Sequence, residues 1–462
     1  DIFTLNTWKN VMGKVRKTIL RRKIDQYLAA WKNDSEHLPL IVKGARQIGK
    51  TESIRFFASQ NYINCIEINF VLQPEYRDIF DDGYTVDRII RNISVHNSDF
   101  VFEPGKTLIF FDEIQKCPNA ATSLKSFKQD GRYDVICSGS LMGIYYQEIE
   151  SNSVGYKEDY LMYSMDFEEY LWAKGYSDEF IASLLKNMIA VEPLPNAIFS
   201  EMNDCFREYM LLGGMPAVVD KFIKQKNYSG ILKMQRQLLL DYEEDITKYA
   251  LGMEKAKILN VYRKIPVFLG SENKKYQISK IARGARNREY IGAIDWLAAA
   301  GIINLCYCMS EPSLPLKGNY NPDFYKIYYG DTGLLIAALD DEAQQDLRDN
   351  KNYNVYKGAI FENIVAEALL KQGYPVYFYR NEKSTIEMDF MLRDRVSIVP
   401  IEVKAVDGAT VSLRNMISNK NNKFSDIKYG IKLAGKNIGD NGQFYTFPYF
   451  LAFLLKRFLS QK

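Results

Sequence analysis

Short apolar runs alternate with helical patterns over the first third of the chain. The runs at residues 38–42, 107–111 and 133–137 have the length and composition of strands that are buried on both faces. Residues 52–60, ESIRFFASQ, follow a helical pattern directly after a Gly-rich segment. Buried strands combined with helices predict a parallel α/β sheet, in which a ligand binds at the carboxyl ends of the strands.

The pattern becomes helical from residue 156 to about residue 249, where apolar residues recur at three- and four-residue spacing. The GGMP segment at residues 213–216 predicts a turn between helices. The acidic residues of the segment 241–249, DYEEDITKY, are expected to form a solvated helix face rather than a metal site.

Residues 255–310 have the layout of a winged helix. A helix over residues 279–285 is followed by a turn, a longer helix over residues 288–301 and a strand. The turn is surrounded by Arg283, Arg286 and Arg288, at the place where a recognition helix would begin and meet phosphates. Winged helices also serve as packing modules within ATPases, so the pattern leaves both DNA contact and protein packing open.

A mixed α/β pattern follows residue 356. A predicted helix carries Glu362, and the predicted strands at residues 385–392 and 397–404 carry acids and a lysine near their ends. Glu387 and Asp389 share one strand face, as do Glu402 and Lys404, because side chains two residues apart point the same way.

If these two strands pair as a hairpin, Asp389, Glu402 and Lys404 converge. Two carboxylates can hold Mg²⁺ while a lysine stabilises the charge that develops on a phosphate. The pattern therefore predicts metal-dependent phosphodiester cleavage, with Glu362, Asp389 and Glu402 as metal ligands and Asp389, Glu402 and Lys404 in catalysis. The alternative is an exposed hairpin whose charges face solvent.

The segment from Gly44 to Thr51, GARQIGKT, matches the P-loop pattern GxxxxGK[ST] between a predicted strand and a predicted helix. Glycines let the backbone fold around phosphate oxygens, and the helix N-terminus directs N–H groups at the anion. Lys50 is expected to lie between the outer phosphates, and the Thr51 hydroxyl is expected to ligate Mg²⁺. The predicted nucleotide contacts are Gly44, Ala45, Arg46, Gln47, Ile48, Gly49, Lys50, Thr51, Glu52, Asp112 and Ser140.

The apolar run at residues 107–111 ends in Asp112 and Glu113. Asp112 is predicted to hold Mg²⁺ through its water shell, and Glu113 to polarise the water that attacks the γ-phosphate. Ser140 follows the next strand and could contact the γ-phosphate or that water. A glutamate after Asp112 favours hydrolysis over transfer to a small substrate, so we predict an ATPase with ATP and Mg²⁺ as cofactors and with Lys50 and Glu113 as catalytic residues.

The amino-acid composition limits the class of protein and the kinds of site that the chain can form. A chain of 462 residues with 47% hydrophobic and 25% charged residues predicts several folded domains. No run approaches the roughly 18 apolar residues of a membrane span, and the first residues lack the apolar core of a signal peptide, so we expect a cytoplasmic protein without a membrane partner. Six cysteines without a CxxC pair predict free thiols, and two histidines leave little material for a zinc site. The net charge of +3 neither requires nor excludes a polyanionic partner.

Taken together, the motifs resemble those of a family of bacterial and archaeal AAA-type ATPases whose C-terminal domain of unknown function is similar to PD-(D/E)XK nucleases. The resemblance covers residues 18 to about 410. Its motifs, in family order, are GARQIGKT, LIFFDEIQ, CSGSL, LLGGMP, YYGDTGLL, GAIFENIVAEAL, EMDF and PIEVKA.

The resemblance implies phosphate and Mg²⁺ binding by Lys50 and Thr51, a second nucleotide motif at Asp112 and Glu113, and a sensor at Ser140. It places Glu362, Asp389, Glu402 and Lys404 on nuclease-like positions. Relatives often carry a Gly-Arg pair where this chain has Gly155-Tyr156-Lys157, which puts an arginine finger acting in trans in doubt.

The predicted organisation is an α/β P-loop NTPase domain with a parallel sheet, followed by a helical and winged-helix region and a mixed α/β nuclease-like domain. Its boundaries are 18–175 for the AAA-type ATPase domain, 176–250 for the helical region, 251–325 for the winged-helix-like domain and 326–462 for the nuclease-like domain. The leading hypothesis is an ATP-hydrolysing switch that controls a nuclease-like domain acting on DNA or RNA. The alternatives are a regulatory or scaffold ATPase whose C-terminal domain binds a protein partner, and a nucleic-acid-binding ATPase that does not cut. The sequence leaves the oligomeric state open.

Overall fold

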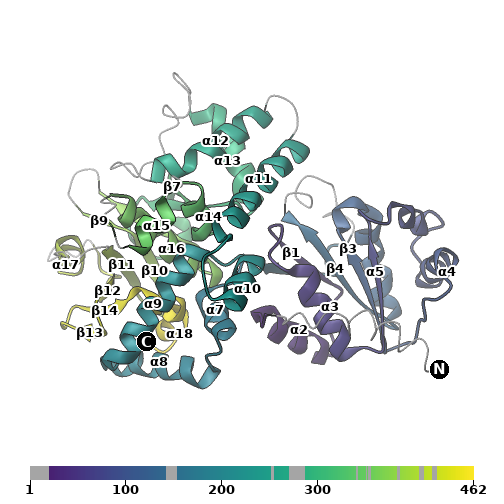
Figure 1. Ribbon diagram of the computed structural model, residues 1–462, viewed down its shortest axis with the longest axis horizontal. Helices are drawn as coiled ribbons and strands as arrows, with labels where there is room; N and C mark the ends of the chain where they lie inside the picture. The colour runs from purple at the N-terminus through teal and green to yellow at the C-terminus, as the bar shows by residue number, and fades with distance from the viewer. Residues whose placement is uncertain are drawn as a thin grey trace.

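The computed structural model describes residues 20–141, 153–250, 254–269, 287–339, 342–349, 351, 355–381, 386–404, 410–418 and 424–462 (Figure 1). The N-terminal sheet lies at the right of Figure 1, and the C-terminal sheets lie at the left with the chain end beside α8.

The N-terminal sheet has five parallel strands in the order β2-β3-β4-β1-β5. They are β1 (Leu40–Gly44), β2 (Asn64–Asn69), β3 (Thr107–Asp112), β4 (Asp134–Ser140) and β5 (Glu158–Met162). The predicted parallel α/β sheet is confirmed. Every residue of β3 is buried, as the uninterrupted apolar run predicts.

Helices cover both faces of this sheet. They are α2 (Lys23–Asn33), α3 (Lys50–Asn61), α4 (Val86–His96) and α5 (Pro118–Asp130), with short 3₁₀ helices η1 (Pro74–Phe80) and η2 (Ile114–Lys116). One face, through Ile66, Ile109 and Val135, packs against α4 and α5. The other face belongs to a core that continues into the rest of the chain.

A helical layer follows the sheet. It contains α7 (Phe167–Lys174), α8 (Asp178–Ala190), α9 (Asn196–Leu212), α10 (Pro216–Gln225), α11 (Ile231–Tyr249), α12 (Glu254–Leu269) and α13 (Asn287–Ala299). The predicted turn at residues 213–216 separates α9 from α10. The predicted helix at 279–285, with Arg283 and Arg286, lies outside the described residues, so the winged-helix arrangement stays a prediction.

Two further sheets form the C-terminal half. One has the order β7-β6-β8-β9, with β6 (Ile303–Met309), β7 (Tyr320–Tyr329), β8 (Tyr377–Arg380) and β9 (Glu387–Met388). The other has the order β10-β11-β12-β14-β13, with β10 (Phe390–Arg393), β11 (Ile398–Lys404), β12 (Gly430–Ala434), β13 (Gly439–Asp440) and β14 (Phe444–Pro448). Their helices are α14 (Thr332–Ala337), α15 (Ala343–Arg348), α16 (Val355–Lys371), α17 (Val411–Ile417) and α18 (Leu455–Leu459), with 3₁₀ helices η4 (Leu316–Gly318) and η5 (Tyr449–Leu454).

The first of these sheets joins segments that the sequence separates. The predicted boundary between residues 325 and 326 falls inside β7, and β7 pairs with β6, which in turn pairs with β8. The predicted strand at residues 385–392 is also divided, because β9 pairs with β8 whereas β10 pairs with β11. Asp389 therefore lies where the chain passes from one sheet to the other.

The LLGGMP and DTG motifs form the junction between the halves. The Asp331 carboxylate accepts hydrogen bonds from the Gly214 N–H at 2.7 Å and from the Ser164 hydroxyl at 3.1 Å. A Cβ atom at Gly213 would lie 2.0 Å from Asp331 Oδ1, so only glycine fits this contact. These motifs are thus explained by packing between distant segments.

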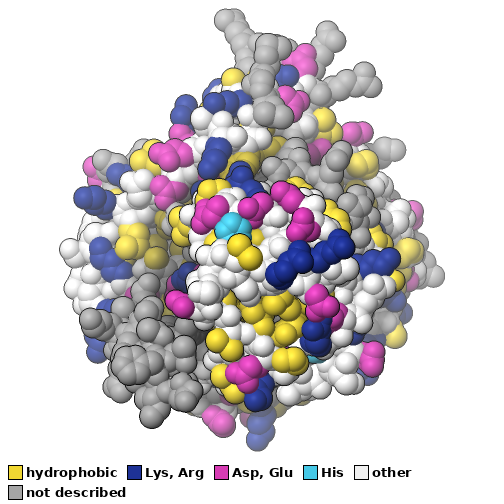
Figure 2. Space-filling model, turned by 90° about the vertical axis from the view of Figure 1, so that its right-hand side faces the viewer, with side chains coloured by type: hydrophobic (Ala, Val, Ile, Leu, Met, Phe, Trp, Pro, Cys, Tyr) yellow, Lys and Arg dark blue, Asp and Glu magenta, His cyan; other side chains and the backbone are white. Residues whose placement is uncertain are grey.

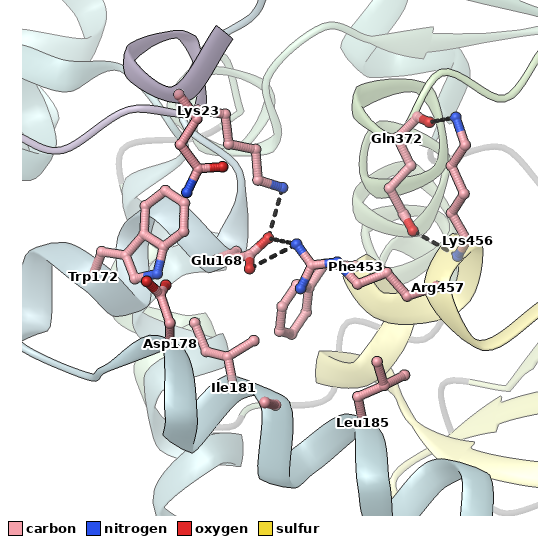
Figure 3. Close-up of a pocket in the computed structure, with 12 residues that line it drawn as sticks. Lys23, Glu168, Trp172, Asp178, Ile181, Leu185, Gln372, Phe453, Lys456 and Arg457 are labelled. Carbon is pink, nitrogen blue, oxygen red and sulfur yellow. Dashed lines mark hydrogen bonds and ion pairs between the residues drawn. The ribbon is translucent and has the colours of Figure 1, made fainter. Parts of the chain in front are cut away.

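A second junction fixes the end of the chain. Figure 3 shows the Glu168 carboxylate of α7 between Lys23 of α2 and Arg457 of α18. This buried carboxylate lies 2.8 Å from the Lys23 ammonium group and 2.7 Å from the Arg457 guanidinium. Because one acid pairs with cations from two distant segments, the C-terminal helix is attached to the N-terminal half through charge as well as through apolar packing.

Candidate functional site

The loop between β1 and α3 has the backbone of a phosphate cradle. A Cβ atom at Gly44 would lie 2.4 Å from both Ile48 Cδ1 and the Met162 carbonyl oxygen, so the loop requires glycine there. Gly49 precedes α3 with a φ of 92°, which is also a glycine conformation. The loop leads directly into the N-terminus of a 12-residue helix, where N–H groups and the helix dipole favour an anion.

Lys50 is folded over this loop. Its ammonium group donates hydrogen bonds to the carbonyl oxygens of Gly44 at 3.1 Å and Ala45 at 2.8 Å. Burial lowers the pKa of Lys50 to about 8, although the Glu113 and Asp112 carboxylates act in the opposite direction. The lysine charge is thus poorly compensated by the protein and is suited to a phosphate.

Asp112 stands at the carboxyl end of β3 and is held by residues from three elements. The Thr51 hydroxyl lies 3.3 Å from both carboxylate oxygens, and Asn69 donates to Oδ2 at 2.8 Å. The Ser138 hydroxyl donates to Oδ1. Hydroxyl and carboxylate oxygens are the ligands that Mg²⁺ prefers, so Thr51 and Asp112 fit the predicted metal.

Glu113 follows in a left-handed conformation with a φ of 58°. Such a backbone is uncommon for a residue other than glycine, and strained positions of this kind cluster at functional sites. Gln115 donates a hydrogen bond to the Glu113 carboxylate and a longer one, 3.4 Å, to the Ser140 hydroxyl. The predicted site residues Glu113 and Ser140 are thus linked through Gln115.

Sequence reasoning missed several residues around this site. Asn69, Gln115 and Ser138 are polar residues at or just after strands, and this position is the signal that could have identified them. Arg22 lies outside any motif, yet its guanidinium donates to the Ile48 carbonyl at 2.7 Å and pairs with Glu169 at 3.0 Å. Only the tertiary structure identifies it as a support of the loop.

The Glu52 side chain is 54% exposed and pairs with Arg55 at 3.1 Å, one helical turn away, so only the backbone N–H of Glu52 is placed for the cradle and its nucleotide contact stays a prediction. One other prediction concerning this region is corrected. The acids of residues 241–249 are not merely a solvated face, because Asp245 is buried and binds Arg46 of the loop at 2.6 Å. Asp241 accepts a hydrogen bond from the Gln47 amide at 2.7 Å, so α11 rests on the phosphate loop.

In the C-terminal half, β10 and β11 form the predicted antiparallel pair, with Phe390 opposite Ile401. Asp389 accepts a hydrogen bond from the Val403 N–H at 2.8 Å, and Lys404 pairs with Glu402 at 2.6 Å. The second oxygen of Glu402 is buried and has no hydrogen-bond partner among the described residues.

A buried lysine that the sequence analysis did not single out lies among the acids. Lys326 of β7 is 2.9 Å from Glu362, 3.3 Å from Glu387 and 4.0 Å from Asp389. Burial opposes the charge of this lysine, but attraction from the three carboxylates outweighs it and raises the pKa of Lys326 above its ordinary value.

The predicted metal set of Glu362, Asp389 and Glu402 does not fit a metal ion in this arrangement. Two of these acids share the Lys326 ammonium group, and the third pairs with Lys404. Within the described ranges, no group of three or more His, Cys, Asp or Glu side chains is arranged to hold a metal. The physical reason is that β7 brings its own cation to the carboxylates.

The parallel sheet, the glycine-dependent loop and the Lys50, Thr51 and Asp112 arrangement define a P-loop nucleotide-binding domain. Residues 36–171 match the family model of an AAA domain, so this part of the chain is similar to AAA-type ATPase domains. Residues 203–345 match a domain of unknown function, DUF8612, and residues 357–449 match another, DUF4143.

Solved structures show distant likeness. The Walker-type ATPase PABY2304 of Pyrococcus abyssi is 12% identical with a TM-score of 0.43, over 70% of this chain and 97% of that one. RuvB of Thermotoga maritima is 13% identical with a TM-score of 0.32, over 70% and 93%. The ORC1 protein of Aeropyrum pernix, solved in complex with DNA, is 12% identical with a TM-score of 0.29, over 71% and 92%.

No curated protein matches this chain in sequence. Among the described residues, none of the helices combines the length and apolar character that crossing a bilayer would require.

Proposed function

We propose that this protein is an ATP-dependent switch in which the nucleotide controls the C-terminal half of the chain. The observation that carries this proposal is the direct contact between the phosphate loop and α11. Arg46 and Gln47 of the loop bind Asp245 and Asp241 of that helix. A change at the phosphates therefore acts on a helix outside the ATPase domain.

Within the ATP site, Lys50 binds the outer phosphates, and Thr51 and Asp112 hold Mg²⁺. Bound Mg²⁺ neutralises phosphate charge and fixes the geometry of the nucleotide. Glu113 orients the attacking water and accepts its proton, while Gln115 fixes the Glu113 carboxylate and links it to Ser140. Asn69 and Ser138 hold Asp112 in place.

Hydrogen exchange tests the switch. Exchange over residues 231–249 is compared with Mg²⁺ and either a non-hydrolysable ATP analogue or ADP, and we expect it to differ between the two nucleotides. Residues 178–190 of α8, which pack against the end of the chain, serve as the internal control and should not change. Equal exchange over α11 with both nucleotides would contradict the coupling.

For the C-terminal half, we infer that it binds nucleic acid without cutting it. Lys326 occupies the position among Glu362, Glu387 and Asp389 where a metal-dependent nuclease would need a cation, so the protein's own ammonium group stands where a metal ion would have to bind. On the other side of α16, a cavity of about 260 Å³ combines basic and aromatic side chains, which suit phosphates and bases respectively. Its lining includes Arg207, Lys351, Lys357, Phe206, Phe361 and Tyr449.

The distribution of surface charge favours a local nucleic-acid site over binding across a broad surface. Figure 2 shows the outer face of the ATPase domain, where Lys and Arg side chains are interspersed with Asp and Glu. Such a face does not offer the single-sign field that draws a nucleic-acid backbone. Nucleic-acid binding is therefore not expected on this face.

Fluorescence anisotropy with labelled single-stranded DNA, duplex DNA and RNA tests this inference. We expect binding that weakens with salt, a substrate that stays intact in Mg²⁺ or Mn²⁺, and weaker binding by Arg207→Ala. Cleavage that disappears in Asp389→Ala and Glu402→Ala would instead restore the nuclease hypothesis. Absence of binding to all three probes would favour a protein partner.

A further inference from the structure

Arg46 connects the phosphate loop to α11 through a side chain that phosphate can also bind. Its Nη1 atom lies 2.6 Å from Asp245 Oδ1, with 31% of the Arg46 side chain and 4% of the Asp245 side chain exposed. The Tyr242 hydroxyl donates a hydrogen bond to the Arg46 carbonyl at 3.2 Å. The arginine is thus partly open to solvent, whereas its acidic partner is enclosed.

Neither charge of the Arg46–Asp245 ion pair is fully compensated by its partner. The second Asp245 oxygen is buried without a hydrogen-bond partner among the described residues, and burial raises the pKa of Asp245. Arg46 belongs to the same loop segment as Lys50, and its charge adds to the effect of burial in lowering the pKa of that lysine. Two cations within one loop favour a polyanion beside them, and a guanidinium group can bind phosphate through two parallel hydrogen bonds.

We propose that Arg46 is a phosphate-sensing residue that exchanges between Asp245 of α11 and the terminal phosphate of ATP. The inference rests on the proposed function and names the contact through which the switch works. ADP lacks the outermost phosphate and leaves Arg46 on Asp245. ATP draws the arginine away and loosens α11 from the loop. Arg46 then adds, within the same chain, a positive charge near the γ-phosphate.

Equilibrium binding of ATP and ADP, with Mg²⁺, to the full chain and its variants tests the exchange. Arg46→Ala should lower the preference for ATP over ADP by about tenfold, and Arg46→Lys should restore part of it. Asp245→Asn, which keeps the shape of the side chain but removes the competing charge, should strengthen ATP binding by about tenfold and change ADP binding by less than about twofold. In the double variant Arg46→Ala/Asp245→Asn, the gain in affinity for ATP should disappear.

Glu243→Gln is the matched control. Glu243 lies on the same helix and binds Arg263 at 2.6 Å instead of the loop, so this variant should leave both affinities unchanged. Thermal melts of all variants report whether each one folds.

Equal changes in ATP and ADP affinity in Arg46→Ala and Asp245→Asn would overturn the inference and make the ion pair purely structural. Lys50→Ala separates this failure from that of the proposed function. Undiminished ATP binding by Lys50→Ala would overturn the proposed function itself. Loss of binding in Lys50→Ala together with an unchanged ATP preference in Arg46→Ala would overturn only the role of Arg46.

Discussion

The ATP site and the C-terminal cluster use the same residue types in opposite ways. In both, acids at or beside strand ends lie near a buried lysine. Lys50 bonds to two backbone carbonyls, and its charge is incompletely compensated. Lys326 bonds instead to Glu362 and lies near two further carboxylates, which stabilise its charge.

This difference distinguishes a lysine whose charge is left for a ligand from one whose charge is used within the protein. A lysine without a carboxylate partner leaves charge for an anion, whereas a lysine paired with carboxylates occupies the place that a metal ion would take. Four predictions test this contrast.

The largest expected effect is on folding. Lys326→Met should lower the free energy of unfolding by roughly 3–5 kcal/mol, because it leaves the buried Glu362 carboxylate without its cation. Denaturant unfolding followed by circular dichroism measures this change. Lys351→Met, at an exposed pair with Asp346, is the control and should cost less than about 1 kcal/mol. Equal free energies of unfolding for Lys326→Met and Lys351→Met would contradict the contrast between Lys326 and Lys50.

The second prediction has opposite signs for activity and stability. Lys50→Met should lower ATP turnover on the order of 10²–10³-fold, because the phosphates lose an oriented positive charge. The same variant should be more stable than the parent by roughly 1–3 kcal/mol at pH 7, since it removes a buried charge with a lowered pKa. Lys106→Met, at an exposed pair with Glu103, should change neither quantity appreciably. A loss of stability in Lys50→Met would show that its ammonium group is well compensated.

The third prediction concerns pH. With a pKa of about 8, Lys50 carries its charge at neutral pH and loses it as pH rises. Affinity for ATP should therefore be constant near pH 7 and fall by up to about tenfold per unit above pH 8, with proton uptake on binding. Calorimetry in buffers of different ionisation enthalpy measures that uptake.

The folded protein should gain stability over the same rise in pH, because the unfolded chain retains the Lys50 proton up to its ordinary pKa of 10.5. An affinity for ATP that does not change up to pH 9.5 would contradict the lowered pKa of Lys50.

The smallest expected effect separates two serines of β4. Ser138→Ala removes a hydrogen bond to Asp112 and should lower turnover by about tenfold, which corresponds to the roughly 1–1.5 kcal/mol of one such bond. Ser140→Ala removes only the longer contact with Gln115 and should lower turnover by less than about threefold. The reverse order would support the sensor role that the family resemblance gave Ser140.

Local patterns predicted the ATP half well. The strands around Val42, Phe110 and Ile136 could be read directly because parallel strands buried on both faces need continuous apolar runs. The positions of Lys50 and Asp112 followed because each is attached to an element with a recognisable pattern. The pairing of β10 with β11 was also correct, since both strands lie close together in sequence.

The sequence predicted contacts less well where the two contacting residues lie far apart along the chain. The sequence placed acids near Lys404 but contained no local sign that Lys326 of β7 would reach them first. It also assigned Asp245 to a solvated face, because helical periodicity describes one helix and does not show what packs against it.

The sequence by itself thus determined the phosphate loop and its neighbouring strand, because the conformations of adjacent residues and their glycines define that structure. Only the tertiary structure decided how the charges are compensated. Arg46 meets Asp245 across 199 residues, and Lys326 meets Glu362 across 36, from one element to another. Whether a charged group attracts a ligand or is already neutralised depends on such distant partners, since burial makes their contact decisive.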